Sequence, residues 1–331
     1  MKPKRIYYEA DVIKYELGKM LLEKYKDVPR IKIESHNRIK ELQERPNTDF
    51  VEMKKYLIIG IRKTHKYVQN EKSSDFLVPY TSSGCSAMCL YCYLVCNYNK
   101  CSYLRLFVNT EQMLEKLIKK SQETEKICTF EIGSNSDLIL ENQITGNLDK
   151  TIERFGKEGR GFITFPTKFS MIDSILNLKH NGKTLIRMSL NPKEIITKVE
   201  YGTSSLENRI NAINKLSDAG YKVGVLIAPV VLIDGWRNIY LKLLDQLKNG
   251  LFNEVRNNLK IEIIFMTYSY VHNAINEQAF PKALKLYNKE IMTGRGKGKY
   301  CYKKECRDEA ENFFKEEIKK RFDSAVIMYI V

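Results

Sequence analysis

The sequence of 331 residues has no apolar run long enough to span a membrane, and its charged start at residues 1–5 leads into no apolar signal segment. We find no internal repeat, low-complexity tract or obvious linker. Histidine is scarce, with four residues, and tryptophan occurs once. These absences exclude a membrane-spanning protein and a repeat array, and we expect a cytoplasmic protein large enough to bury a full core.

A glycine-rich phosphate turn after an early strand is also missing, which argues against a doubly wound dinucleotide-binding sheet. Short β-rich runs instead alternate with helix-length amphipathic stretches, a pattern typical of βαβ units and a parallel sheet. The predicted strands are 57–61, 104–108, 127–132, 161–165, 185–189, 222–228 and 261–266, and the predicted helices are 110–120, 148–155, 171–178, 206–219 and 236–247.

About six such units, wound right-handed, predict an α/β fold of the partial (β/α)6 barrel type. We expect an N-terminal extension over residues 1–80 that packs on the barrel. The barrel itself would cover residues 81–267. A C-terminal appendage of a β-hairpin and a helix would follow over residues 268–331.

Basic residues outnumber acidic ones, with Lys+Arg 55 against Asp+Glu 40 and a formal net charge of +15. Such a balance favours a polyanionic partner such as nucleic acid. Lysines also simply solvate a surface in many proteins. The charge alone therefore does not decide between the two interpretations.

Three of the eight cysteines, Cys85, Cys89 and Cys92, stand in the spacing C-x3-C-x2-C. Five of the eight crowd between Cys85 and Cys101, which does not suit a disulfide scaffold and favours a reducing compartment. No fourth cysteine or histidine lies at a usual zinc interval. An iron–sulfur cluster normally takes four thiolates, so three would leave one iron open to another ligand. The alternatives are buried thiols or an incomplete zinc knuckle.

Polar residues follow several predicted strands at their carboxyl ends. Ser134, Ser136 and Asp137 follow the strand that ends at residue 132, Lys168 follows the next strand, and Ser189 ends another. In a parallel barrel these positions meet at one mouth, where functional side chains lie. Serine and aspartate are also good helix N-caps, so each residue alone has a structural explanation. As a set, beside the cysteine loop, they predict a cofactor site.

Several strings along the whole chain resemble the spore photoproduct lyase family of radical S-adenosylmethionine (AdoMet) enzymes. They are residues 8–18, 35–37, 59–64, 84–94, 167–169, 179–184, 202–204, 228–229 with 235–236, and 298–300. The family repairs the methylene-bridged thymine dimer of spore DNA, 5-thyminyl-5,6-dihydrothymine. The resemblance therefore implies a carbon–carbon lyase that restores two thymines in damaged double-stranded DNA.

The same resemblance implies the cofactors. The three cysteines of the loop would ligate a [4Fe-4S] cluster, and Ser136, Lys168 and Ser189 match positions that hold AdoMet. The cluster and AdoMet would supply a 5′-deoxyadenosyl radical, which takes a hydrogen from the lesion. The resemblance also implies an electron donor such as flavodoxin or ferredoxin, and a place of action in the spore core or germinating cell.

The hydrogen-return step is where this chain departs from the family. Tyr91 and Tyr93 match tyrosines that return the hydrogen to AdoMet, but the family's donor cysteine is Ser134 here. A serine O–H bond is too strong to replace a thiol in this role. We expect Cys96 or Cys101 to act as a relocated donor, or the tyrosine pair to reduce the thymine radical directly. The third possibility is a family member with another nucleic-acid or small-molecule substrate, or one that has lost its activity.

A basic, glycine-punctuated segment near the C-terminus contains Arg295, Lys297, Lys299 and Tyr300. It predicts a hairpin whose cations meet phosphates, because glycine lets the chain turn without a side chain in the way. The family uses a hairpin here to fill the gap left by the flipped lesion. A solvated loop is the alternative, and a non-catalytic metal-binding nucleic-acid protein remains a weaker hypothesis for the whole chain.

Overall fold

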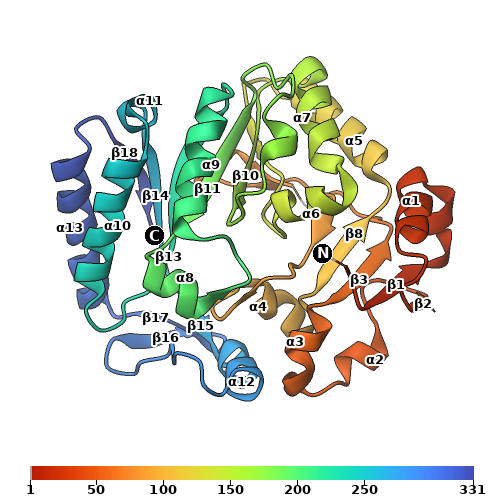
Figure 1. Cartoon of the computed structure of the whole chain (residues 1–331), viewed down its shortest axis with the longest axis horizontal. Coiled ribbons are helices and arrows are strands. Elements are labelled where there is room, and N and C mark those ends of the chain that lie inside the picture. Colours follow the sequence, from red (N-terminus) through yellow and green to blue (C-terminus); the bar gives the residue numbers. More distant parts are fainter. Residues whose placement is uncertain (1, 79) are drawn as a thin grey trace.

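The computed structural model describes residues 2–78 and 80–331, and two mainly parallel sheets form its framework (Figure 1). The first sheet has the order β2 (Arg30–Ile33), β1 (Arg5–Glu9), β3 (Tyr56–Gly60), β8 (Leu104–Phe107), β6 (Ser82–Ser83). The second has the order β18 (Val326–Ile330), β14 (Lys260–Phe265), β13 (Lys222–Val230), β11 (Thr184–Leu190), β10 (Phe162–Thr167), β9 (Thr129–Glu131), β5 (Phe76–Leu77), β4 (Val68–Gln69).

All pairs in the first sheet are parallel except β6 with β8, and all pairs in the second are parallel except β4 with β5. The remaining strands are short: β7 (Met88–Cys89) pairs with β12 (Glu200–Tyr201), and β15 (Tyr268–Ser269), β16 (Met292–Gly296) and β17 (Lys299–Tyr302) form a small antiparallel sheet. This arrangement confirms the predicted α/β fold.

Helices cover the strands on the outside, and Figure 1 shows them along the outer side of the curved row of strands. The helices are α1 (Glu16–Lys24), α2 (Lys40–Gln43), α3 (Phe50–Met53), α4 (Leu94–Tyr98), α5 (Thr110–Glu123), α6 (Leu138–Thr145), α7 (Asn147–Glu158), α8 (Lys193–Val199), α9 (Leu206–Asp218), α10 (Trp236–Gly250), α11 (Asn253–Asn257), α12 (Tyr270–Ala279) and α13 (Lys304–Arg321). Single 3-10 turns lie at Ala10–Lys14, Asn47–Asp49, Asn99–Cys101 and Asp173–Ile175. No helix in the described part of the chain is long and apolar enough to cross a membrane.

All seven predicted strands appear, as β3, β8, β9, β10, β11, β13 and β14, and four of the five predicted helices appear as α5, α7, α9 and α10. The predicted helix at 171–178 is wrong, because only a single 3-10 turn forms there. Ile172 and Ile175 are fully buried, so the apolar spacing marked core positions correctly although no helix forms. The polar residues between them favour local turns over a continuous helix.

Strand pairing crosses both predicted segment boundaries. The strands β1 to β3 of residues 1–80 share a sheet with β8, and β18 of residues 268–331 pairs with β14. The hydrophobic core lies between the second sheet and its helices, where Phe130, Phe155 and Phe165 are fully buried. The three-part division into residues 1–80, 81–267 and 268–331 stays a prediction.

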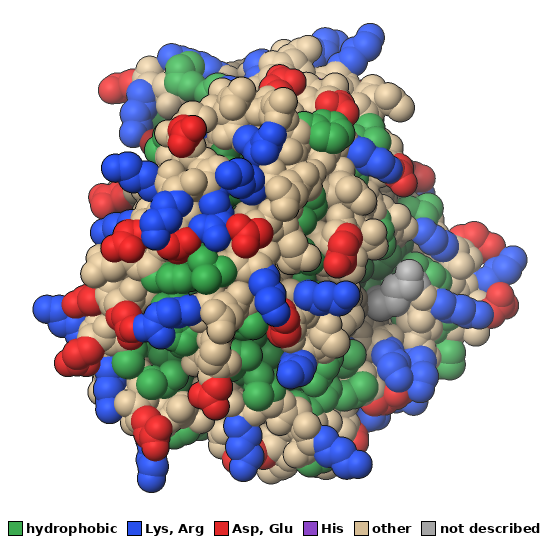
Figure 2. Space-filling view, turned by 60° about the vertical axis from the view of Figure 1, so that its left-hand side comes forward, with side chains coloured by type: hydrophobic (Ala, Val, Ile, Leu, Met, Phe, Trp, Pro, Cys, Tyr) green, Lys and Arg blue, Asp and Glu red, His purple; other side chains and the backbone are tan. Residues whose placement is uncertain are grey.

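The surface charge is mixed on the face that carries α10 and α13. Figure 2 shows Lys and Arg interspersed with Asp and Glu there, with apolar side chains between them. On α13, Lys315 lies 2.7 Å from Glu311 and Lys320 lies 2.6 Å from Glu317. Exposed pairs of this kind contribute little to stability. On this face the lysines solvate the surface and form no single-sign patch.

Candidate active site

A cavity of about 420 Å³ lies at the carboxyl ends of the second sheet's strands. It brings together most of the predicted site residues. The predicted residues that line it are Cys85, Cys89, Cys92, Tyr91, Tyr93, Ser134, Ser136, Asp137, Lys168 and Ser189. The position agrees with the rule that parallel α/β barrels carry their sites at this end.

The cysteine loop is held in place by backbone contacts on both sides. β7 contains Cys89, which pairs with Glu200 of β12, and the Leu90 N–H donates to the Val199 carbonyl at 2.9 Å. At the start of the loop, Gly84 has a φ of +75°, and a Cβ there would meet the Tyr103 carbonyl oxygen at 1.9 Å. Only glycine therefore fits this entry to the loop.

Behind the loop lies a buried cation that the sequence did not single out. Lys54 is 2% exposed, and its Nζ donates to the carbonyls of Cys85 at 2.8 Å and Ser102 at 2.9 Å. Burial lowers the pKa of this amine. The ammonium fixes the loop backbone, and it places a positive charge near sulfur atoms that must be thiolates to bind metal.

The three loop thiols are free, and all face the same cavity. Among the described residues, no three His, Cys, Asp or Glu side chains converge closely enough to hold one metal ion. In an iron–sulfur cluster each thiolate binds its own iron, so such convergence is not required. This donor set fits a [4Fe-4S] cluster and does not fit a closed zinc site.

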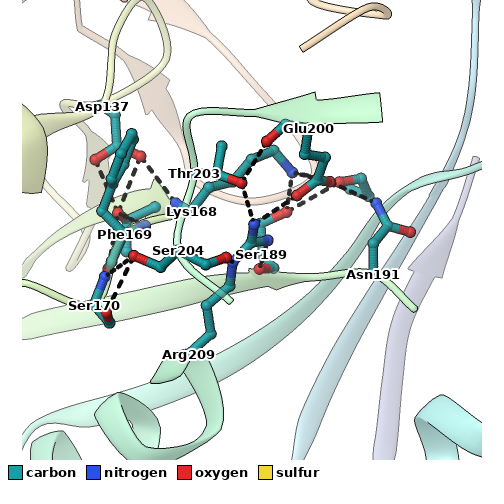
Figure 3. Close-up of polar contacts among 12 residues, drawn as sticks. Asp137, Lys168, Phe169, Ser170, Ser189, Asn191, Glu200, Thr203, Ser204 and Arg209 are labelled. Atoms are coloured by element: carbon teal, nitrogen blue, oxygen red, sulfur yellow. Dashed lines mark hydrogen bonds and ion pairs between the residues drawn. The ribbon is translucent and has the colours of Figure 1, made fainter. Parts of the chain in front are cut away.

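Lys168 is the centre of a polar network on the cavity wall (Figure 3). Its Nζ donates to the Ser189 hydroxyl, to the Ala228 carbonyl at 2.8 Å and to Glu200 at 3.3 Å. Arg209 reaches the other Glu200 oxygen at 2.6 Å, and both side chains are fully buried. The predicted cofactor residues Lys168 and Ser189 are thus joined directly.

Glu200 is the residue of this network that sequence reasoning missed. It also accepts from Asn191 Nδ2 at 2.8 Å and from the Tyr91 hydroxyl. Burial alone would raise the pKa of Glu200, but the charges of Lys168 and Arg209 lower it to about 2. The only sequence hint was its place just before the 202–204 string. That place in the sequence does not indicate that the Glu200 carboxylate contacts Lys168 and Arg209.

Asp137 is a helix N-cap, which was the structural explanation considered for it from the sequence. Its carboxylate caps α6, accepting from the Ile139 N–H at 3.2 Å and the Leu140 N–H at 3.3 Å. It also accepts from the Lys168 N–H at 2.9 Å, which fixes the start of the turn after β10. Neighbouring Ser136 hydrogen bonds to the Ser82 hydroxyl and faces the cavity.

Three tyrosines line the cavity in different settings. Tyr91 is buried, and its hydroxyl donates to Glu200. Tyr93 is 53% exposed and lies at the rim. Tyr329, which sequence reasoning missed, comes from β18, and its hydroxyl donates to Glu262 at 2.5 Å. Phenol groups are therefore available on two sides of the same space.

Neither predicted replacement thiol lines this cavity. Cys96 is half-buried, with its Sγ 3.5 Å from the Ser269 hydroxyl and 4.0 Å from His272 Nδ1. Cys101 is buried in a separate apolar cluster with Tyr7 and Tyr103. Both follow the loop in sequence, but the turn of α4 and the 3-10 segment after it carry them away from the cavity.

A buried ion-pair network that the sequence pattern did not reveal also contributes to the cavity wall. Arg187 lies 2.6 Å from Glu131 and 2.9 Å from Glu262. Ser73 donates to Glu131, and both line the cavity together with Arg187. Glu131, Arg187 and Glu262 stand inside short β-rich runs, where a single charged residue gives no local pattern.

The predicted C-terminal hairpin is present as β16 and β17. Arg295, Lys297 and Lys299 are exposed and form no ion pair with the residues that the structure describes. Tyr300 is half-buried against Tyr287, with ring centroids 4.7 Å apart. At the tip, a Cβ on Gly298 would meet the Tyr270 ring at 2.3 Å. The glycine lets the exposed Tyr270 pack across the hairpin, so three free cations stand beside an aromatic surface.

Comparison with known proteins decides the family. The family model described as spore photoproduct lyase matches residues 1–331. The chain belongs to the spore photoproduct lyase family. It is 32% identical over 99% of its length to the spore photoproduct lyase of Bacillus subtilis (strain 168), covering 98% of that protein, and 30% identical to that of Clostridium acetobutylicum with the same coverage.

Solved structures of spore photoproduct lyase agree with this fold. A complex with dinucleoside spore photoproduct, and a double variant with bound AdoMet and the same dinucleoside, each match with a TM-score of 0.91. In both cases the identity is 30%, and 99% of each chain is covered. The predicted partial barrel is thereby confirmed. As a spore photoproduct lyase family member, the chain is a radical AdoMet lyase whose cofactors are AdoMet and a [4Fe-4S] cluster.

Proposed function

We propose that this chain converts the spore photoproduct in double-stranded DNA to two thymines. The observation that carries the proposal is the single cavity in which the three loop thiols face the Lys168–Ser189 pair. The relatives that share this fold over 99% of the chain include complexes with the dinucleoside lesion. Because the substrate is DNA, the protein would act in the cytoplasm, in the spore core or germinating cell.

Within the cavity, Cys85, Cys89 and Cys92 would hold the cluster. When bound, the cluster and AdoMet supply the 5′-deoxyadenosyl radical that starts the reaction. Lys168 offers an ammonium, and Ser136 and Ser189 offer hydroxyls, to the carboxylate and ribose of AdoMet. A flavodoxin or ferredoxin would deliver the electron.

The test is lesion turnover without oxygen. The reconstituted and reduced protein is given AdoMet and a dinucleotide spore photoproduct, and the products are identified by mass spectrometry. We expect two thymines. AdoMet cleavage without thymine would instead favour the second candidate, a family member with another substrate, which the serine at position 134 supports.

For hydrogen return, we propose the tyrosines and not a relocated cysteine. Cys96 and Cys101 lie outside the cavity, whereas Tyr91 and Tyr93 line it. In a Tyr93→Phe variant the thymine yield per AdoMet cleaved should fall at least about tenfold, because phenylalanine keeps the aromatic ring but has no hydroxyl hydrogen to donate. The measurement is thymine yield per AdoMet cleaved. Cys96→Ala and Cys101→Ala should keep the normal yield.

A drop in thymine yield in either cysteine variant would place the donor on that cysteine and overturn this assignment. Tyr287→Phe is the matched control, because Tyr287 is 40% exposed and does not line the cavity. Its yield should equal that of the unchanged protein.

DNA binding is proposed for the hairpin. Replacing Lys297 or Lys299 by glutamine should weaken binding to undamaged and damaged duplexes alike, because a phosphate contact carries no base information. Each loss should reduce the slope of log K against log salt by about 1. The measurement is a fluorescence titration at several salt concentrations. Lys319→Gln on α13, also an exposed lysine, should leave the slope unchanged.

A further inference from the structure

A second cavity, of about 310 Å³, lies at the carboxyl edge of the first sheet. Its lining includes Glu9 at the end of β1, residues 35–37 after β2, residues 62–64 after β3 and Phe107 at the end of β8. Ligands of open parallel sheets bind at this edge. Two of the sequence strings that the lyase chemistry leaves unexplained, 35–37 and 59–64, meet at this cavity.

The lining includes three cations without acidic partners. Arg62, Lys63 and Arg105 all line the cavity, and none of them forms an ion pair with a carboxylate among the described residues. The carboxylate of Glu9, which also lines the cavity, already accepts three hydrogen bonds from His36 and Ile61. It accepts from the backbone N–H of His36 at 2.8 Å, from His36 Nδ1 at 2.8 Å and from the Ile61 N–H at 2.9 Å.

Arg105 gives the second, independent observation. It is only 4% exposed, and its Nε donates to the His36 carbonyl at 3.2 Å. Its Nη1 is buried and has no hydrogen-bond partner. Tyr98 and Tyr103 flank the guanidinium, with ring centroids at 4.8 Å and 4.4 Å. The carbonyl and the two rings leave Nη1 without an acceptor and the guanidinium without a counter-charge, so this side chain can still accommodate an anionic ligand.

The backbone around the cavity is fixed. A Cβ on Gly60 would meet the His36 ring at 2.7 Å. The absence of a side chain at Gly60 therefore lets the His36 ring pack directly against the end of β3. Asn109 accepts from the Arg62 N–H and donates to its carbonyl, both at 2.9 Å. The Arg62 Nε donates to the Tyr80 carbonyl at 2.9 Å, and burial lowers the pKa of Arg62 to about 10.

We propose that this second cavity binds a phosphate group. The two guanidinium groups supply forked donors that match phosphate oxygens, and the Lys63 ammonium adds a positive charge. The volume is at the low end for ligand pockets, which suits a small phosphate ester or one backbone phosphate of a nucleic acid. The two sources share the same chemistry. The site is separate from the cysteine cavity and does not depend on lesion repair.

The experiment is calorimetric titration of the full-length reconstituted protein, saturated with AdoMet so that the first cavity is filled. The probes are inorganic phosphate, thymidine monophosphate and a short undamaged duplex. Lys63→Gln should weaken binding about tenfold, and Arg105→Gln more, since each removes a charged hydrogen bond. Lys66→Gln, an exposed lysine outside the cavity, should bind as the unchanged protein does.

Binding of phosphate or the nucleotide that depends on Lys63 would assign the site to a free phosphate ester. If only the duplex binds in a way that depends on Lys63, the site is assigned to a backbone phosphate of a nucleic acid. The proposal is overturned if no probe binds, or if binding is the same in Lys63→Gln and Lys66→Gln. Because Lys63 is exposed, its replacement tests the site even if Arg105→Gln fails to fold. The titration measures no lesion turnover, so its result is independent of the repair activity.

Discussion

A Cys89→Ala variant should lose cluster binding, and with it AdoMet cleavage should fall at least about a thousandfold. Cys89 lines the cavity between the other two loop thiols, and no other cysteine of the described residues lies there to replace it. Removal of one thiolate leaves two ligands for the cluster, where four are usual. The measurements are iron per chain after reconstitution without oxygen and the yield of 5′-deoxyadenosine.

The matched control is Cys306→Ala. Cys306 is half-buried on α13, outside the cavity, and its thiol is also free. This variant should bind iron and cleave AdoMet as the unchanged protein does. Full iron content in Cys89→Ala would show that the loop does not supply the cluster ligands in the way the cavity geometry indicates.

Glu200→Gln should lower the free energy of unfolding by about 3 kcal/mol, because it leaves a buried arginine without its counter-charge. Arg209 is fully buried and keeps only neutral acceptors, the carbonyls of Ser189 and Ser204, and the Thr203 hydroxyl. Lys168 loses the same partner. The measurement is urea unfolding of the iron-free protein, and Glu207→Gln, an exposed residue seven positions on, is the control.

The effect should depend on pH in a defined direction. The Glu200 pKa is lowered from 4.5 to about 2 in the folded protein, so the carboxylate stabilises the fold above pH 4.5. This contribution is lost as the pH falls from 4.5 towards 2. The difference between Glu200→Gln and the unchanged protein should therefore shrink over that range. A difference that is constant with pH would contradict an ionised Glu200.

Periodicity predicted the strands of the barrel correctly, because each buried parallel strand is a short apolar run between helix-length segments. It did not reveal α6, whose residues are almost all buried and so lack an amphipathic pattern. The cysteine loop, Lys168 and Ser189 were found from their spacing and strand-end positions. Lys54 and Glu200 were not, because their hydrogen-bond partners come from other segments of the chain and leave no local pattern.

The positions of the two cysteines that were candidate hydrogen donors show the same limit, and the identity of the donor stays a prediction. Cys96 and Cys101 are close to the cysteine loop in sequence, yet α4 turns the chain so that both point into other clusters. Tyr329 is far from the loop in sequence and lines the cavity through the pairing of β18 with β14. Sequence distance is a poor guide to a site assembled from both ends of a curved sheet.

Because β18 is the last strand of the chain and pairs with β14, one part of the cavity wall is completed only at the end of synthesis. The loop cysteines leave the ribosome before the strand that carries Tyr329, which is the last part of the cavity to be made. In a nascent chain the loop thiols can thus be exposed before β18 has added its part of the cavity wall. An iron centre acquired at that stage would face oxygen and water directly, so we expect cluster insertion to be safest after the last strand has docked.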